Sequence, residues 1–229
     1  MKKKILLIGS GGSLINSQLG DKIDSFDGLV CRFNGYLTNG FENDVGSKCD
    51  IWCMNPRIYF NICFNEEWKI TDTLTLTIDD LENFNGDILV GGYWHLWGKF
   101  AESGYMQEAL DSFDNAKVMN EQIIKNCFLK LNEYCYESER SHNLIATTGL
   151  ETIMHYISCN YEVYLVGFDS TNKNIIENDK HYYSDHRFNE EDMQDSFRNP
   201  LFVKRQHSIN IEKKWIQELE EWGLIKRLD

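Results

Sequence analysis

The sequence predicts an α/β protein, in which a mostly parallel sheet lies between helices in a single α/β/α layered domain. Short apolar runs at residues 5–8, 29–33 and 163–168 have the pattern of strands buried on both faces. Stretches with helical periodicity alternate with these runs, which is typical of a layered sheet. A chain of 229 residues suits one domain, so we expect residues 1–229 to fold as a single unit.

The first half of the chain holds most of the expected strands. After the runs at residues 5–8 and 29–33, apolar segments at 50–54 and 87–90 are each closed by turn residues. Residues 74–78 are a further candidate strand. Because parallel strands end at one edge of a sheet, we expect a ligand to bind where these strands end.

The expected helices lie in the second half. Residues 121–134 repeat apolar side chains at helical spacing. Another helix begins at Thr148, where Thr148 and Glu151 fit a capping box. A closing helix, capped by Gly223 before an edge strand at 224–225, carries an apolar stripe. The stripe consists of Ile211, Trp215, Leu219 and Trp222.

Residues 169–200 break this alternation of strands and helices. The segment is rich in Asn, Asp, Lys and Glu and is nearly free of large aliphatic residues, and it contains His181 and Tyr182. A polar stretch of this length is usually a functional lid or disordered. We expect a mobile lid that becomes ordered when a ligand binds and that excludes water from the site.

Charge and cysteine content restrict the partners and the compartment. A formal charge of -13 disfavours nucleic-acid backbones as partners, although a local cluster of donors still permits one nucleotide. Seven cysteines without Cys-x-x-Cys spacing predict free, mostly buried thiols in a reducing compartment. No stretch approaches the ~20 apolar residues of a transmembrane segment. We therefore expect a cytoplasmic protein, in solution or peripheral at the inner face of the membrane.

Four motifs follow one another along the chain. The first is long and consists of Gly9-Ser10-Gly11, Ile23-Asp24, Arg32-Phe33-Asn34 and Gly40-Phe41-Glu42-Asn43-Asp44-Val45-Gly46. The second consists of Ala146-Thr147-Thr148-Gly149, a helix, Cys159, and a strand ending in Gly167-Phe168. The third is His181-Tyr182-Tyr183, and the fourth is His207 with Glu212 five residues later.

In this order the motifs resemble those of the family 29 sialyltransferases, and the resemblance spans nearly the whole chain. It implies a Rossmann-like domain of the sialyltransferase GT-A-like variant. It also implies a glycosyltransferase that moves sialic acid from CMP-sialic acid to a glycan hydroxyl with inversion. The implied partners are a CMP-sugar donor and a glycan acceptor, such as a lipid-linked or surface oligosaccharide.

The resemblance also indicates the site residues. Those expected to bind the donor are Gly9, Ser10, Gly11, Asn34, Thr147, Thr148, Gly149 and Tyr182. Transfer needs a base near neutral pH, for which histidine is suited, and His207 is the candidate. His181 is expected to stabilise the leaving phosphate. We find no carboxylate pair spaced to hold a metal ion, so we expect neither a metal nor another cofactor.

Three departures from the family pattern affect these expectations. Ala146 replaces the usual proline, and Ser10 replaces an asparagine that contacts the donor, so this contact is weaker or water-mediated here. The family disulfide joins the cysteine at position 159 to one at the head of the first strand. Ile5 occupies that partner position, so the resemblance implies that Cys159 is unpaired.

Other readings remain open at the level of the sequence. CMP-Kdo carries the same nucleotide and a similar acidic sugar, so motifs that hold the nucleotide do not separate it from CMP-sialic acid. A degenerate relative that binds CMP without transfer is a second alternative. A Rossmann-type methyltransferase would explain the glycine turn at residues 9–12, but not the motifs at the C-terminal end.

Overall fold

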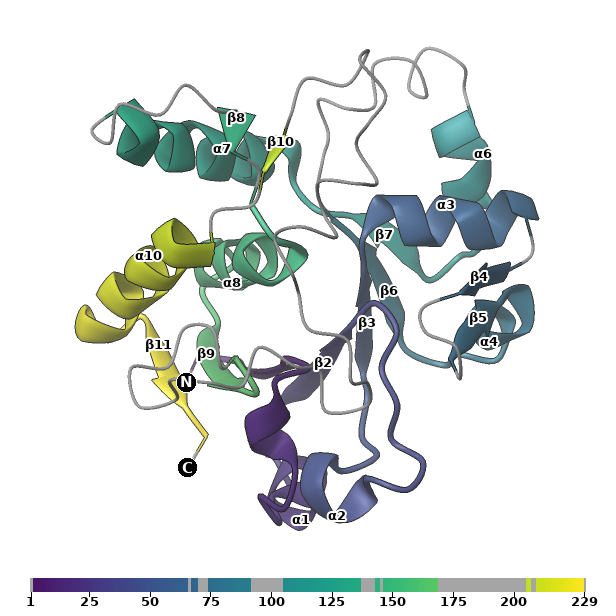
Figure 1. Cartoon of the computed structure of the whole chain (residues 1–229). Helices are drawn as coiled ribbons and strands as arrows, with labels where there is room; N and C mark the ends of the chain where they lie inside the picture. Colours follow the sequence, from purple (N-terminus) through teal and green to yellow (C-terminus); the bar gives the residue numbers. More distant parts are fainter. Residues whose placement is uncertain are drawn as a thin grey trace.

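The central feature of the computed structural model is a sheet of seven parallel strands, in the order β11-β9-β1-β2-β3-β6-β7 (Figure 1). The structure describes residues 2–65, 67–69, 74–91, 105–136, 143–144, 146–168, 205–206 and 209–228. The strands are β1 (Lys4–Ile8), β2 (Leu29–Phe33), β3 (Ile51–Met54), β6 (Asp87–Val90), β7 (Ala116–Val118), β9 (Glu162–Val166) and β11 (Ile225–Arg227). The expected α/β fold with a mostly parallel sheet is confirmed.

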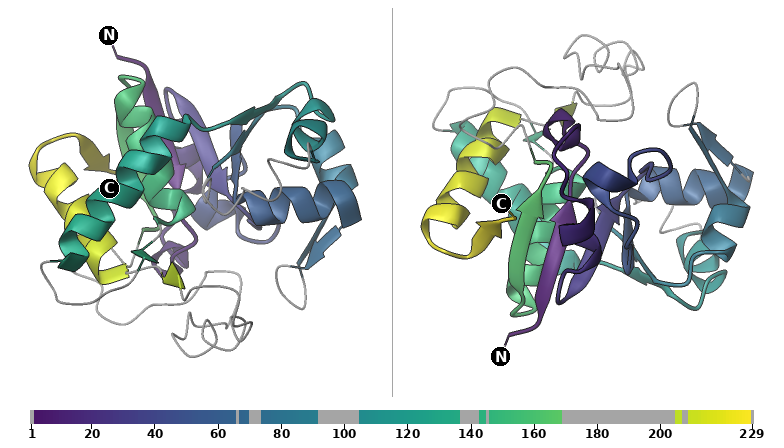
Figure 2. Two further views of the ribbon diagram at one scale, coloured as in Figure 1. Left: turned by 90° about the horizontal axis from the view of Figure 1, so that it is seen from above. Right: turned by 90° about the horizontal axis from the view of Figure 1, so that it is seen from below.

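One face of the sheet is covered by three helices: α7 (Glu121–Tyr136), α8 (Thr148–Ser158) and α10 (Ile209–Glu221). Figure 2 shows them gathered on one side of the molecule. Alternate residues of the strands, such as Ile5 and Leu7 of β1, pack with Leu131, Leu150 and Leu219 of these helices in one buried cluster. Because strand side chains alternate between the two faces of the sheet, every second residue of β1 contacts the apolar sides of these helices.

The other face is covered in two parts. Near β1 and β2 lie the 3-10 helix η1 (Gly12–Leu14), α1 (Gly20–Asp24) and α2 (Glu42–Val45), which pack around Leu6, Ile8 and Val30. Near β3 and β6 lie α3 (Pro56–Asn65), α4 (Ile78–Glu82) and α6 (Tyr105–Asp111), which surround Trp52 and Ile88. Helices on both faces explain why the strand sequences are continuously apolar.

Two small sheets lie outside the main one. Residues 74–78, expected as a strand, contain β5 (Thr75–Thr77), which pairs antiparallel with β4 (Glu67–Lys69) and does not join the central sheet. The second pair is β8 (Asn143–Leu144) with β10 (Arg205–Gln206). This pair holds the chain that leads into α10 beside the chain that leads into α8.

The C-terminal helix ends as expected, with one difference. Gly223 has a φ of +69°, and Leu224 N donates to Leu219 O at 2.9 Å, which closes the last turn. Trp215 and Leu219 are buried, but Trp222 is 63% exposed, so its place on the buried stripe was predicted wrongly. Trp222 follows Glu221, the last residue of α10, so it does not belong to the helix that packs on the sheet. None of the described helices combines the length and apolarity needed to cross a bilayer.

The order of the strands reverses between β1 and β9. The chain moves outward from β1 through β2, β3, β6 and β7, and then returns to place β9 and β11 on the other side of β1. In open parallel sheets, ligands bind beyond the carboxyl ends of the strands at such a reversal. The glycine turn after β1 and the Gly167-Phe168 end of β9 both lie there.

The long motif folds around a buried arginine. Arg32 is 1% exposed, and its guanidinium donates to Val45 O at 2.6 Å, to Gly46 O at 3.1 Å and to Lys48 O at 3.0 Å. These bonds fix the segment after α2 against β2. The guanidinium charge thus serves to hold backbone carbonyls, since each of these three acceptors is a main-chain oxygen.

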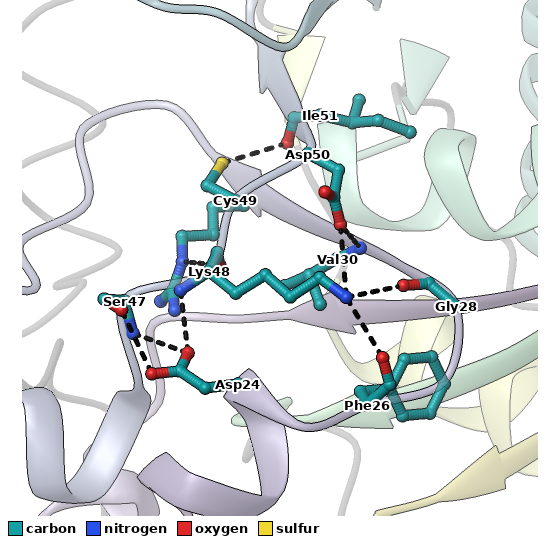
Figure 3. Close-up of polar contacts among 10 residues, drawn as sticks. Asp24, Phe26, Gly28, Val30, Ser47, Lys48, Cys49, Asp50 and Ile51 are labelled. Atoms are coloured by element: carbon teal, nitrogen blue, oxygen red, sulfur yellow. Dashed lines mark hydrogen bonds and ion pairs between the residues drawn. The ribbon is translucent and has the colours of Figure 1, made fainter.

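A carboxylate holds the same segment from the other side (Figure 3). Asp24 accepts hydrogen bonds from the amides of Ser47 and Lys48, both at 2.7 Å, and from the Ser47 hydroxyl at 3.0 Å. Burial alone would raise the pKa of Asp24, but these bonds lower it below its ordinary value. The Lys48 ammonium donates to Phe26 O and Gly28 O, which ties the segment to the chain before β2.

Gly46 is required at the centre of this network. Its φ of 64° and ψ of -179° lie in a region that is essentially restricted to glycine. A Cβ at this position would lie 2.5 Å from Asp24 Oδ1. We therefore predict that Gly46→Ala lowers the free energy of unfolding by about 3 kcal/mol or more, measured by urea denaturation.

Gly40→Ala is the matched control. Gly40 also has a positive φ, +84°, but a Cβ there would meet nothing within 4 Å. The control should cost only about 1 kcal/mol, from the left-handed backbone alone. Equal losses in the two variants would contradict the role given to Gly46.

Candidate active site

The turn after β1 is bonded directly to the end of β9. Gly9 N donates to Val166 O at 2.8 Å, and Gly11 N donates to Gly167 O at 2.9 Å. A Cβ on Gly9 would lie 2.3 Å from Gly167 O, so no other residue fits here without moving the backbone. Because the amides of Gly9 and Gly11 are used within the protein, a ligand at this turn would meet Ser10 rather than these two groups.

Phe168 brings three of the expected site segments together. Its ring lies edge-on to Phe33 at the end of β2, with the ring centroids 5.9 Å apart. A Cβ on Gly149 would lie 3.0 Å from the Phe168 ring, and one on Gly9 would lie 3.1 Å from it. The ends of β1, β2 and β9 and the start of α8 therefore meet around this side chain.

Asn34 lies in the bend after β2, with a φ of 49°. Its Oδ1 accepts from Asn55 N at 2.7 Å, and its carbonyl accepts from Trp52 Nε1 at 2.6 Å. Asparagine tolerates this left-handed conformation better than most residues do. The bond from Asn55 fixes the orientation of the amide, so Asn34 presents an NH₂ group that can only donate and an Oδ1 with one remaining lone pair.

Thr147, not Thr148, caps helix α8. The Thr147 hydroxyl accepts from Leu150 N at 3.2 Å, and Thr148 is the first helical residue. The predicted capping box of Thr148 and Glu151 is therefore wrong. Glu151 faces the core and is 1% exposed, because the helix turns this position toward the sheet.

Glu212 of α10 replaces the missing carboxylate of the capping box. Its Oε1 accepts from Thr147 N at 2.8 Å, and its Oε2 accepts from the Thr147 hydroxyl at 2.6 Å. A helix start has four amides without a partner inside the helix, here those of Thr147, Thr148, Gly149 and Leu150. Glu212 uses the first and the Thr147 hydroxyl uses the last.

The remaining two amides belong to Thr148 and Gly149. In the part of the chain that the structure describes, neither donates to another protein group. Both point out from the start of an 11-residue helix, where the aligned peptide dipoles favour an anion. This helix start is next to Phe168 and the strand reversal, so it can bind an anionic group of a ligand.

Two buried glutamates lie behind the helix start. Burial raises the pKa of Glu212 to about 7, although the bonds from Thr147 lower it. Burial also raises the pKa of Glu151 well above its ordinary value, with smaller contributions from Cys53 and Glu212. Glu151 Oε2 has no hydrogen-bond partner among the described residues, which suits a protonated, neutral side chain.

Some expected site residues lie outside the described residues. These are His181 and Tyr182, together with the expected lid at 169–200, and the base candidate His207. Gln206, the residue before His207, pairs with Leu144, just ahead of the Thr147 cap. The roles predicted for these three side chains stay predictions.

The described cysteines are free thiols, and the described residues contain no cluster of metal ligands. Cys31 and Cys53 are buried free thiols as expected, but Cys159 is an exposed free thiol at the end of α8. Among the described residues no three His, Cys, Asp or Glu side chains are grouped to hold a metal ion. The absence of a metal requirement is therefore still to be tested.

Sequence reasoning missed two parts of this site. It did not identify Phe168 as the side chain that joins the segments, although the Gly167-Phe168 pair ends a strand of the second motif. It also left the role of Glu212 open, because the partner of this residue is Thr147, 65 residues earlier. Contacts over such a separation have no local signal in one sequence.

A parallel sheet with an anion-binding helix start at the strand reversal is the architecture of a nucleotide-binding α/β enzyme. The model of glycosyltransferase family 29 (sialyltransferase) matches residues 3–224. The chain therefore belongs to this family, as the four motifs predicted.

Curated relatives match a short segment at higher identity. The chain is 46% identical to beta-galactoside alpha-2,6-sialyltransferase 2 of Gallus gallus over 55 residues, which is 24% of this chain and 10% of the relative. It is 46% identical over 54 residues to CMP-N-acetylneuraminate-beta-1,4-galactoside alpha-2,3-sialyltransferase of Mus musculus, which is 24% of this chain and 14% of the relative. The match thus covers a small part of each relative's length.

A solved structure agrees with the fold over the whole chain. The crystal structure of a mammalian sialyltransferase in complex with Gal-beta-1-3GalNAc-ortho-nitrophenol matches with a TM-score of 0.59 and 17% identity. The match covers 99% of this chain and 69% of that one. At this identity the similarity concerns the fold.

The expectation of a cytoplasmic protein, in solution or at the inner membrane face, is wrong. The curated sialyltransferases that the chain matches are type II membrane proteins of the Golgi, with the enzyme in the lumen. The expectation relied on unpaired cysteines and on a short apolar run near the N-terminus. Neither feature determines the compartment of a protein.

Glu212 should make the protein more stable in acid. Its pKa is about 7 when folded and 4.5 ordinarily, so between these values the folded protein holds a proton that the unfolded chain has lost. The free energy of unfolding should therefore fall as pH rises from 4.5 past 7, by at most about 3 kcal/mol from this residue. Glu212→Gln should remove this contribution, as measured by urea denaturation at pH 5 and pH 8. The same pH dependence in the variant and the wild type would contradict it.

Proposed function

We propose that this protein transfers sialic acid from CMP-sialic acid to a glycan hydroxyl, with inversion and without a metal ion. The observation that supports this most is the pair of amides at Thr148 and Gly149, placed at the strand reversal in a member of family 29. A CMP-sugar has one phosphate, and two amides at a helix start suit such a group.

The leaving group is CMP, so the transition state places negative charge on that phosphate. Preorganised donors stabilise developing charge without reorganisation, and they can replace a metal ion in this role. The amides of Thr148 and Gly149 are such donors, and His181 with Tyr182 would add to them. Asn34 would offer its NH₂ group to the ribose or the phosphate, since its Oδ1 is held by Asn55.

The acceptor hydroxyl needs a base, for which we propose His207. A single displacement from the face opposite CMP inverts the anomeric carbon. Two displacements would require a carboxylate nucleophile, and the motifs mark none. The segments on either side of His207 support its place near the donor: β10 pairs with β8, and α10 carries Glu212, which binds the cap of α8.

A donor assay tests the function directly. We expect the protein to consume CMP-sialic acid in the presence of a galactoside acceptor and EDTA, at the rate seen without EDTA. CMP-Kdo, offered in parallel, decides between the two acidic sugars. Binding of CMP without turnover of either donor would instead identify a non-catalytic relative, and loss of activity in EDTA restored by manganese would refute the metal-independent mechanism.

Thr148→Pro tests the phosphate site. Proline lacks the amide hydrogen but is favoured at the first helical position, and Thr147 has the extended backbone that precedes proline. The variant should lose one hydrogen bond to a charged group and bind CMP about tenfold or more weakly. Calorimetry with CMP gives the affinity.

Thr148→Ala is its control, because it removes the same side chain and keeps the amide. It should bind CMP with nearly the affinity of the wild type. Both variants should bind cytidine, which lacks the phosphate, with the same affinity. If both variants bind CMP equally, the Thr148 amide does not contact the phosphate.

His207→Ala should lower kcat about a hundredfold or more, because removal of a general base typically costs that much. Its CMP affinity should change little. His181→Ala should weaken both CMP binding and turnover, because it would touch the phosphate. Kinetics with CMP calorimetry on both variants check this, and near-normal turnover by His207→Ala would end the role given to this base.

A further inference from the structure

The Thr147 hydroxyl makes hydrogen bonds with both Leu150 N and Glu212, and these two bonds determine where its single hydrogen points. It has one hydrogen to donate and two lone pairs that can accept. One lone pair accepts from Leu150 N at 3.2 Å, and Oε2 of Glu212 lies 2.6 Å away. An ionised carboxylate can only accept, so the single hydrogen points to Glu212. In that state the Thr147 hydroxyl cannot donate to a ligand.

Protonation of Glu212 reverses this bond without losing one. The Oε1 atom, which lies 2.8 Å from Thr147 N in the structure, is then a carbonyl oxygen and still accepts from this amide. The new Oε2 hydrogen donates to the second lone pair of the Thr147 hydroxyl. The hydroxyl hydrogen of Thr147 no longer donates to Glu212 and becomes able to donate to a ligand at the start of α8, beside the amides of Thr148 and Gly149.

We propose that Glu212 is a positioning residue coupled to a proton. When a phosphate binds at the start of α8, Glu212 takes up one proton from the solvent, and Thr147 turns its hydroxyl hydrogen to the phosphate. No covalent bond other than the new O–H bond forms or breaks. This inference rests on the phosphate site of the proposed function.

Electrostatics favours the exchange. An ionised Glu212 and a bound phosphate would place two negative charges at one helix start, and protonation removes one of them. Since burial already raises the pKa of Glu212 to about 7, protonation near neutral pH costs little.

Among the described residues, Glu151 and Cys127 interact electrostatically with Glu212, and burial favours the neutral form of both. Burial is the main reason that the pKa of Glu151 on α8 is raised well above its ordinary value, which favours its neutral form. Burial likewise raises the pKa of Cys127 on α7, so this thiol is neutral too. The ion pair of Glu220 with Arg227 lies at the other end of α10.

Glu212→Gln separates this exchange from a plain structural clamp. Glutamine keeps the oxygen that accepts from Thr147 N, and its NH₂ group donates to the Thr147 hydroxyl as the protonated acid would. The variant should therefore bind CMP more tightly than the wild type at pH 8, and this advantage should shrink toward pH 6. If phosphate raises the pKa of Glu212 from about 7 to about 8, the gain is about fivefold at pH 8 and approaches about tenfold at higher pH. A clamp that needs its charge predicts weaker CMP binding at both pH values, and that result would overturn the proposal.

Two control variants restrict the interpretation. Glu151→Gln replaces a second buried glutamate of the same region. Its backbone amide donates to Thr147 O, but its carboxylate makes no hydrogen bond to Thr147. This variant should retain the wild-type pH dependence. Thr147→Val, which has no hydroxyl, should weaken CMP binding, and Thr147→Ser should restore it. A pH dependence lost in Glu151→Gln, or a Thr147→Val variant that binds normally, would count against the exchange.

Proton uptake gives a direct measurement on the unmodified protein. CMP binding at pH 7.5, measured by calorimetry in two buffers of different ionisation enthalpy, should take up more protons than the titration of CMP itself explains. An uptake fully explained by CMP overturns the inference even if Glu212→Gln fails to fold. Absence of any CMP binding by the wild type would instead refute the proposed function.

Discussion

The close approach of the Gly9 and Gly167 backbones is the constraint on which the site depends. A Cβ on Gly9 would lie 2.3 Å from Gly167 O, and a Cβ on Gly167, whose φ is +68°, would lie 2.8 Å from Gly9 O. Only two glycines let the ends of β1 and β9 come this near. Their contact places Phe168 against Gly149, and so fixes where helix α8 starts relative to the sheet. The glycine turn therefore acts first on the packing of strands, and through this packing on the ligand site.

Charged and titratable side chains of the motifs act in the same indirect way. Arg32 binds three carbonyl oxygens, Asp24 binds two amides, and Glu212 binds one amide and one hydroxyl. Arg32 and Glu212 are buried, and a buried polar or charged group is costly unless its hydrogen bonds are made, so these two side chains favour one loop geometry over others. The motif residues with the strongest electrostatic effect thus shape the segments that carry the site and leave ligand contact to neutral donors.

The fold was largely predictable from the sequence, and the site only in part. Strands such as residues 29–33 have a local signal, because burial on both faces requires a continuous apolar run. Spacing placed the start of α8 correctly but suggested the wrong cap, since two adjacent threonines fit the pattern and a glutamate three residues later does not show which way it points. The real partner of Thr147 is Glu212 on another helix, and only the packing of α10 against α8 brings them together. Trp222 fits the spacing of the stripe, but α10 ends one residue before it and the side chain is exposed.

The four amides at the start of α8 explain why the second motif has two threonines followed by glycine. Thr147 caps the helix by accepting from Leu150 N, the last of these amides, and its own amide, the first, donates to Glu212. Thr148 contributes an amide, and its side chain is buried. Gly149 contributes the second amide and leaves the space that the Phe168 ring occupies. With a formal charge of -13, the protein repels anions at long range, so an anion must be bound by such local donors. A proton on Glu212 would add the Thr147 hydroxyl to these amides, and a bound anion would favour the protonated form.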